Sequence, residues 1–338
     1  MTQLYLGTQT GVLRVRLNGS RGALEEVLPG VDVKSLALDP LRPERILAAT
    51  AGQGLWRSND AGSRWNQVGE GIDNPNLWSV AVSRSDRHGP DGTVYVGTEM
   101  SAMYRSDDGG TTFRELRAFR DLPSRPEWSY PPVPDTHHVH SLVADPHEPG
   151  RVFAGIELGG IMRSRDGGET WEDHNPGADL DPHTLLAHPN AAGRVYEAGG
   201  TSYRETRDGG ESWRTAEVSP EVDYFYSLAV DGSDPDCVVI SAAHDPFTGH
   251  GVMNEPAWST LYRHTACGGW EEVTDGLPPR EGTAMGFLAS AEPESGVFYY
   301  STIPGVIYRS TDSGLTWTPV AGAADGSQRV VVNHLVAA

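Results

Sequence analysis

Short apolar runs alternate along the whole chain with segments rich in Gly, Pro and Asp. Residues 34–68 read KSLALDPLRPERILAATAGQGLWRSNDAGSRWNQV, and residues 140–174 repeat the same order of apolar runs and turns. Short or alternating apolar runs bounded by Asp-Pro and Gly are typical of β-strands. Units of four such strands that recur about every 40–60 residues predict a β-propeller, in which each unit forms one blade.

One octet recurs where the third strand of a unit turns into the fourth. It reads SNDAGSRW (58–65), SDDGGTTF (106–113), SRDGGETW (164–171), TRDGGESW (206–213) and STDSGLTW (310–317), usually with Arg just before it. The Asp carboxylate can accept hydrogen bonds from the backbone amides of the turn, and the Gly supplies a positive φ. The aromatic residue begins the return strand. We therefore expect the octet aspartates to be structural and not catalytic.

Two further segments complete the count of blades. Residues 227–273 form a unit whose octet has lost its Asp. Residues 4–27 read as the second, third and fourth strands of a blade, and residues 329–338 read as its missing first strand. Together they close the ring and cover its edges. We predict an all-β, seven-bladed propeller that forms a single domain over residues 1–338.

The octet resembles the Asp-box, or BNR, repeat of sialidases and their relatives, and the resemblance covers nearly the whole chain. These relatives include BNR-type glycoside hydrolases, sortilin-like receptors and the photosystem II assembly factor family. The resemblance implies the propeller architecture. Because enzymes, receptors and assembly factors all use this fold, function has to be argued from the site.

Composition and charge narrow the range of partners. The chain has 26 Lys and Arg against 46 Asp and Glu, a formal charge of −20. Without a basic run, we expect no nucleic-acid partner. The chain has no run of 18 apolar residues and does not start with a signal-peptide pattern, so we expect a cytoplasmic protein without a membrane partner. Cys237 and Cys267 are too few for a disulfide scaffold, and we expect free thiols.

Alignment of the units places two rings of side chains at one mouth of the central channel, on the face that we call the top. The octets lie on the opposite rim. The residues that begin the first, innermost strands are Lys34, Trp78, His140, His183, Tyr226, Met285 and Asn333. The residues that end the second strands are Gln9, Ala51, Glu99, Glu157, Glu197, His244 and Ile303.

Residues 135–146, DTHHVHSLVADP, carry three histidines in four positions at this mouth. Alternate side chains of an extended segment share a face, so we expect His138 and His140 to point the same way and His137 to point elsewhere. The alignment also puts His140 beside Glu157 of its own blade, next to His183 and Glu197 of the following blade. A single polar residue at a water-filled channel needs no function, so the prediction depends on the convergence of several.

The two longest insertions, 119–136 and 245–258, both connect strands at the top face. Insertions confined to one face of a repeat fold usually mark its binding face. Both carry aromatic residues and Pro, which suits a wall or lid over a site. The alternative is that they are variable surface loops.

The residue types at the mouth suit three kinds of chemistry. The predicted catalytic residues are His140, His183, Glu157 and Glu197. The predicted flanking, ligand-binding residues are Glu99, Tyr226, His244, Lys34 and Trp78. The candidate ligands for a divalent metal such as Zn²⁺, Mn²⁺ or Fe²⁺ are His138, His140 and His183. Without a metal, a histidine can act as a base oriented by a glutamate, and a glutamate pair suits glycoside hydrolysis.

Two functions of different classes follow from this site. The first is a small-molecule or carbohydrate-type ligand site that works as a glycosidase-like hydrolase or a metal-dependent lyase. Sialidases grip a carboxylate with three arginines, but here Arg57, Arg105 and Arg163 precede the octets on the opposite rim. We therefore do not expect sialidase activity and transfer no sialidase catalytic residue. The second function is a non-catalytic scaffold that holds a partner protein on the same face.

Overall fold

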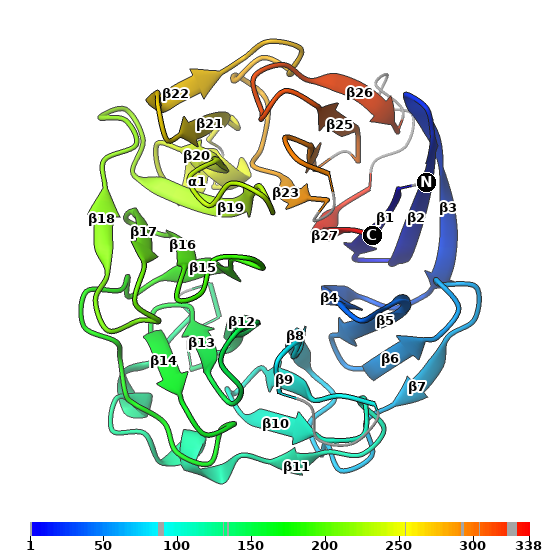
Figure 1. The fold of residues 1–338 in the computed structure, drawn as a ribbon, viewed down its shortest axis with the longest axis vertical. Coiled ribbons are helices and arrows are strands. Elements are labelled where there is room, and N and C mark those ends of the chain that lie inside the picture. Colours follow the sequence, from blue (N-terminus) through cyan, green and yellow to red (C-terminus); the bar gives the residue numbers. More distant parts are fainter. Residues whose placement is uncertain are drawn as a thin grey trace.

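The repeated units form blades around a central axis (Figure 1). The computed structural model describes residues 2–86, 91–130, 132–133, 135–253, 255–291, 294–303, 305–322 and 330–338. Within these residues, seven antiparallel sheets follow one another around the ring. The first strand of each blade is innermost and contacts the first strands of both neighbouring blades. The prediction of an all-β, seven-bladed propeller is confirmed.

Each blade is described by its strands from the axis outward. Blades 1 to 3 consist of β27 (Val332–Ala337), β1 (Gln3–Thr8), β2 (Gly11–Asn18) and β3 (Arg21–Pro29); β4 (Val33–Asp39), β5 (Arg42–Thr50), β6 (Gly54–Ser58) and β7 (Asn66–Val68); and β8 (Leu77–Val82), β9 (Val94–Thr98), β10 (Met103–Ser106) and β11 (Arg114–Glu115). Blades 4 and 5 consist of β12 (Val139–Ala144), β13 (Val152–Ile156) and β14 (Gly160–Ser164); and β15 (Pro182–Ala187), β16 (Val195–Gly199), β17 (Tyr203–Thr206) and β18 (Arg214–Ala216). Blades 6 and 7 consist of β19 (Tyr224–Val230), β20 (Val238–Ala243), β21 (Thr260–Thr265) and β22 (Gly269–Val273); and β23 (Phe287–Ser290), β24 (Phe298–Ser301), β25 (Ile307–Ser310) and β26 (Thr318–Ala321).

Short helices occur in the two long insertions. The 3₁₀ helices η1 (Arg117–Asp121) and η2 (Arg125–Glu127) lie between β11 and β12, and α1 (Pro246–His250) follows β20. In blade 4, an isolated bridge between Arg163 and Glu172 takes the place of a regular fourth strand. No helix in the described part of the chain is long and apolar enough to cross a membrane.

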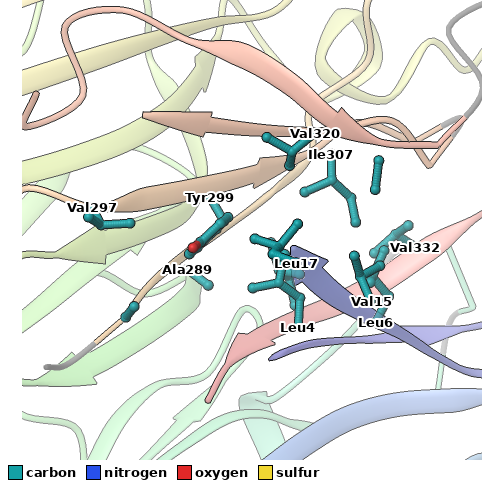
Figure 2. Close-up of a cluster of buried hydrophobic side chains, with 13 residues drawn as sticks. Leu4, Leu6, Val15, Leu17, Ala289, Val297, Tyr299, Ile307, Val320 and Val332 are labelled. Carbon is teal, nitrogen blue, oxygen red and sulfur yellow. The ribbon is translucent and has the colours of Figure 1, made fainter. Parts of the chain in front are cut away.

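The ring closes in blade 1, where two segments from far apart in the sequence pair. β27 is antiparallel to β1, with Leu335 opposite Leu6. Side chains from blades 7 and 1 form one apolar cluster at this junction, including Leu4, Tyr299 and Val332, which are at most 1% exposed (Figure 2). Since burying one such side chain contributes about 1.5–3 kcal/mol, the closure is held by core packing as well as by strand pairing. Arg329 of the predicted closing segment lies outside the described residues.

The octet turns have the expected internal hydrogen bonds. In blade 4, Asp166 Oδ1 accepts from the Thr170 amide (2.9 Å), and Asp166 Oδ2 accepts from the Thr170 hydroxyl (2.6 Å). Gly168 donates its amide to Ser164 Oγ (2.8 Å) and has a φ of +93°. The other four octets use Asp in the same way. The structural role predicted for these carboxylates is confirmed.

An arginine on the third strand of a blade links that blade to the octet turn of the next. The guanidinium groups donate to backbone carbonyl oxygens at 2.6–3.1 Å, and the pairs are Arg14–Ala61, Arg57–Gly109, Arg105–Gly167 and Arg163–Gly209. These bonds explain why Arg so often precedes the octet. Blade 5 has Glu205 at this position, and the following blade has lost the octet Asp.

Both cysteines are free thiols in the structure, as expected. Cys237 precedes β20 and is buried, which raises the pKa of its thiol to about 11. Cys267 is exposed in the turn between β21 and β22.

Candidate functional site

The side chains that begin the innermost strands meet around the axis, as the alignment predicted for most of them. The rings of His140 and His183 lie 5.8 Å apart, and those of His183 and Tyr226 lie 5.2 Å apart. On the other side, Trp78 lies 6.1 Å from His140, and the Lys34 ammonium lies 5.2 Å from the Trp78 ring. Residues from blades 2 to 6 therefore form one continuous arc at the top mouth.

A β-bulge positions these side chains. In blade 4 the register of β12 against β13 shifts between Val139 and Ser141, so that His140 is the extra residue. The same shift occurs at His183 in blade 5 and at Trp78 in blade 3. Because a bulge bends the strand locally and re-aims a side chain, it turns these residues toward the axis.

The predicted position of Met285 in this ring is wrong. Leu288 of blade 7 pairs with Tyr300, and Leu142 of blade 4 pairs with Ala154 in the same way. Leu288 therefore corresponds to Leu142, and Gly286, two residues earlier, corresponds to His140. Met285 is fully buried and packs with Tyr224.

Glu157 is the centre of the arc. It directly follows β13, and its Oε2 lies 2.9 Å from His138 Nε2 and 3.0 Å from His140 Nδ1. The two imidazole nitrogens lie 3.3 Å from each other. His138 and His140 thus face the same group, while the His137 ring packs edge-on against Trp128 at 5.6 Å. The prediction that only two of the three histidines share a face is confirmed.

The electrostatics of this group favour an ionised Glu157. Burial alone would raise the pKa of this carboxyl, but the hydrogen bonds from His138 and His140 outweigh it and hold the pKa well below its usual range. Burial lowers the pKa of His138, against the opposing hydrogen bond to Glu157. The His138 side chain is 0% exposed, whereas His140 and Glu157 are each 17% exposed, so the cluster is open to water on one side.

Asp181 and His183 approach Glu157 from blade 5. His183 Nδ1 lies 2.7 Å from the carbonyl oxygen of Phe225, and its Nε2 lies 3.5 Å from Asp181 Oδ2. Burial lowers the pKa of His183, but the hydrogen bond and charge of Asp181 outweigh it, so that the net pKa is raised. The Asp181 side chain is 18% exposed.

Asp181 and Tyr224 were not predicted as site residues, although the sequence carries a signal for them. Three inner strands begin with two polar or aromatic residues two apart, namely His138–His140, Asp181–His183 and Tyr224–Tyr226. His250 was also missed. It lies in α1, and its Nε2 is 3.0 Å from the Tyr224 hydroxyl.

The structure places Glu197 away from the mouth, so its predicted position beside Glu157 is wrong. Glu197 of blade 5 pairs with Leu185, and Ala154 of blade 4 pairs with Leu142 in the same way. Glu197 therefore corresponds to Ala154, which lies three residues before Glu157. Its carboxylate is 0% exposed and accepts from the Asp179 amide at 3.1 and 3.2 Å. Burial raises its pKa to about 8.

His244 also differs from the prediction. Its side chain is exposed, its Nδ1 lies 2.6 Å from the Glu221 carbonyl oxygen, and its ring stacks on Trp258 at 3.7 Å. The 245–258 insertion therefore brings His250, and not His244, to the arc.

The remaining predicted residues, Trp78, Glu99 and Lys34, lie on the side of His138 that faces blades 2 and 3. Trp78 stacks on the His138 ring at 3.6 Å and donates its indole N–H to Glu99 Oε2 at 3.0 Å. Lys34 pairs with Asp32 at 2.9 Å. Tyr130, from the 119–136 insertion, contacts the His138 ring at 4.8 Å. Both long insertions thus reach the same site, as predicted.

Two overlapping groups of side chains in the arc have the geometry to hold a metal ion. They are His138, His140 and Glu157, and Glu157, Asp181 and His183; in each group the donor atoms lie within 4.8 Å of one another. His183 belongs to the second group, so the predicted set of three histidines is divided between the two.

Comparisons with known proteins support the fold and indicate a class of relatives. No protein-family model matches the chain. A xyloglucanase from a Paenibacillus species is 24% identical over 333 residues, which cover 85% of this chain and 31% of that protein. The chain spans between 13% and 31% of the length of the curated xyloglucanases that it matches.

Solved structures of other proteins also resemble this chain in fold. The GH74 xyloglucanase from Xanthomonas campestris superposes with a TM-score of 0.64 at 21% identity, covering 96% of this chain and 47% of that one. YCF48 bound to D1 peptide superposes with a TM-score of 0.56 at 14% identity, covering 94% and 84%. The chain therefore shares its propeller fold with both proteins.

Proposed function

We propose that this propeller binds a glycan at its top axial mouth and hydrolyses it there. The observation that carries the proposal is the convergence on Glu157 of His138 and His140 from one blade and of Asp181 and His183 from the next. The likeness to xyloglucanases over 85% of the chain supports the choice of a glycan as the ligand.

The walls of the mouth suit a sugar chain. Binding sites for small ligands combine aromatic surfaces with a few placed polar groups. Tyr130 lies 4.8 Å from the His138 ring and Tyr226 lies 6.1 Å from the His140 ring, and Tyr226 also contacts Phe287 of blade 7 at 5.5 Å. We expect these rings to pack against sugar faces, while carboxylates and imidazoles contact hydroxyl groups.

Hydrolysis of a glycosidic bond needs a proton for the departing oxygen and a group that accepts a proton from the attacking water. Asp181 and His183 suit the proton transfers, because Asp181 favours the protonated form of His183 and is itself in contact with water. Glu157, held ionised, suits contact with sugar hydroxyl groups beside this pair.

The test measures binding and cleavage separately. Xyloglucan oligosaccharides are titrated into the protein by calorimetry, and release of reducing ends is followed with the same oligosaccharides. Asp181→Asn should reduce cleavage by at least about a hundredfold while binding changes little. Asp223→Asn, an exposed acidic residue beside the start of β19, is the matched control. Absence of binding to every oligosaccharide would refute the proposal.

A second candidate is a scaffold for a partner protein on the same face. The 245–258 insertion exposes Phe247 (48%), Val252 (47%) and Met253 (76%), and exposed apolar groups of this kind often mark interfaces. The likeness in fold to peptide-bound YCF48 fits this candidate as well. Tight binding of unstructured peptides, without binding of oligosaccharides, would favour it.

A further inference from the structure

We propose that His138 Nε2, His140 Nδ1 and Glu157 Oε2 bind one divalent transition-metal ion, with open coordination positions that face the mouth. The inference deepens the function proposed above. It rests on that function only for the identity of the ligand, a glycan, that would occupy the open coordination positions.

The spacing of the three donor atoms is the first argument. They form a triangle with sides of 2.9, 3.0 and 3.3 Å. With metal–ligand bonds of about 2.1 Å, neighbouring ligand atoms lie about 3.0 Å apart in an octahedral site and about 3.4 Å apart in a tetrahedral one. The observed sides fall in this range, so an ion can bind all three atoms with only small side-chain movements.

The chemistry of the donors is the second argument. Two imidazoles and one carboxylate on one side of an ion form a common set for Zn²⁺ and Fe²⁺, and such sets leave positions for water or substrate. Ca²⁺ and Mg²⁺ prefer oxygen donors only. The net charge of the three ligands is −1 when the imidazoles are neutral, and Asp181 adds a second carboxylate within 4.8 Å of Glu157.

The support behind the ligands is the third argument. The His138 ring is fully buried between the stacked Trp78 ring and the edge of Tyr130. Trp78 is in turn fixed by its hydrogen bond to Glu99. Groups that fix the orientation of the ligands are typical of metal sites. Here ring packing fixes His138, because its buried Nδ1 has no hydrogen-bond partner among the described residues. Glu157 and His140 are each 17% exposed, so a water or a substrate oxygen can reach the ion and complete the coordination.

The geometry also distinguishes this group from its neighbour. His183 and Asp181 lie 3.5 Å apart, and His183 is already bonded to a backbone carbonyl at 2.7 Å. That bond leaves His183 Nε2 available, but the two groups share Glu157, so we expect one ion per chain, bound by the group with the shorter donor distances.

The experiment is a calorimetric titration of the full chain, stripped of metal by a chelator, with ZnCl₂ and MnCl₂, and with MgCl₂ and CaCl₂ as hard-cation controls. We expect one Zn²⁺ per chain and little binding of Ca²⁺. His140→Ala should weaken Zn²⁺ binding by at least about a hundredfold, and Glu157→Gln by at least about tenfold. His244→Ala, an exposed histidine on the same face, is the matched control and should bind as the wild type does.

A second readout guards against misfolded variants. Because a ligand that binds only the folded state raises its stability, Zn²⁺ should raise the Tm of the wild type and of His244→Ala but not that of folded His140→Ala. Zn²⁺ binding absent from the wild type, or unchanged in both His140→Ala and Glu157→Gln, would overturn the inference. Titration of xyloglucan oligosaccharides into the stripped and the loaded protein separates the two proposals. Metal binding without glycan binding refutes only the proposed function, and glycan binding without metal binding refutes only this inference.

Discussion

Replacing Glu197 by Gln tests whether the carboxyl group of Glu197 is shielded from water in the folded protein. The carboxyl group is 0% exposed, and burial raises its pKa to about 8 against the Asp179 amide, which donates to it. The folded protein therefore keeps this proton up to about pH 8, whereas the unfolded chain loses it near the ordinary value of 4.5. Between these values the folded state binds more protons, so the free energy of unfolding falls as pH rises.

The magnitude follows from the two pKa values. At about 1.4 kcal/mol per pH unit, a pKa of about 8 in place of 4.5 corresponds to on the order of 5 kcal/mol. This contribution is present in full below pH 4.5 and is lost as pH rises through about 8. Gln has nearly the same shape and cannot ionise, so the Glu197→Gln variant should lack this pH dependence.

The assay is guanidinium chloride unfolding, followed by tryptophan fluorescence between roughly pH 5 and pH 9 at constant ionic strength. The difference in unfolding free energy between variant and wild type should shift by several kcal/mol in favour of Gln as pH rises. Glu221→Gln, an exposed residue of the same blade face, is the control and should give a constant difference. Parallel pH curves for Glu197→Gln and the wild type would refute the reasoning, because they would mean that the carboxyl group is hydrated in the folded protein.

Three further predictions concern the octets and the turns. Asp166→Ala removes the hydrogen bonds of one octet and should cost about 1–2 kcal/mol, a fall in Tm of a few degrees, whereas His140→Ala at the mouth should leave the Tm of the metal-free protein nearly unchanged. Burial raises the pKa of Asp208, but hydrogen bonds from Ser212 outweigh it and lower the pKa to about 2. The ionised carboxylate therefore stabilises the folded state above pH 3.8, and this contribution is lost as pH falls through 2. The free energies of unfolding of Asp208→Asn and the wild type should become equal only near pH 2. Gly276 has a φ of +77°, and an added Cβ would lie 1.7 Å from a backbone carbonyl oxygen of blade 7, so Gly276→Ala should cost on the order of 3 kcal/mol in chemical denaturation. Gly282→Ala, with φ +82° and open space, should cost only about 1 kcal/mol.

The fold could be predicted almost completely from the sequence, because it is encoded by local rules that repeat. Each octet specifies its own turn, and each apolar run specifies its own strand, so an error in one unit is corrected by the others. The degenerate unit at 227–273 and the divided blade 1 were identified by this redundancy.

The site was harder to predict, because it depends on register and on insertions, neither of which repeats. Glu157 follows the end of β13, but Glu197 lies in the middle of β16, and a shift of three residues separates the mouth from the core. His250 reaches the arc through α1, where its Nε2 contacts the Tyr224 hydroxyl. The position of a residue within an insertion cannot be predicted from the repeat, because the insertion has no counterpart in the other blades. The positions of His138 and His140 at the mouth were predicted, since both lie at the repeating start of a first strand, and their roles stay a prediction.

The pairing of β27 with β1 has a consequence for how the chain comes to be folded during its synthesis. Leu4 of β1 pairs with Ala337, so more than 300 residues must be made before β1, the second strand of blade 1, has its inner partner β27. Closing a loop of that length costs about 3 kcal/mol more in chain entropy than closing one of about ten residues, because each doubling of length adds about 0.6 kcal/mol. Until then β1 presents an unpaired, apolar edge, the kind of edge on which nascent chains aggregate. The ring therefore stays open until Val332–Ala337 has been made, and the pairing of β27 with β1 is a late step in the folding of the propeller.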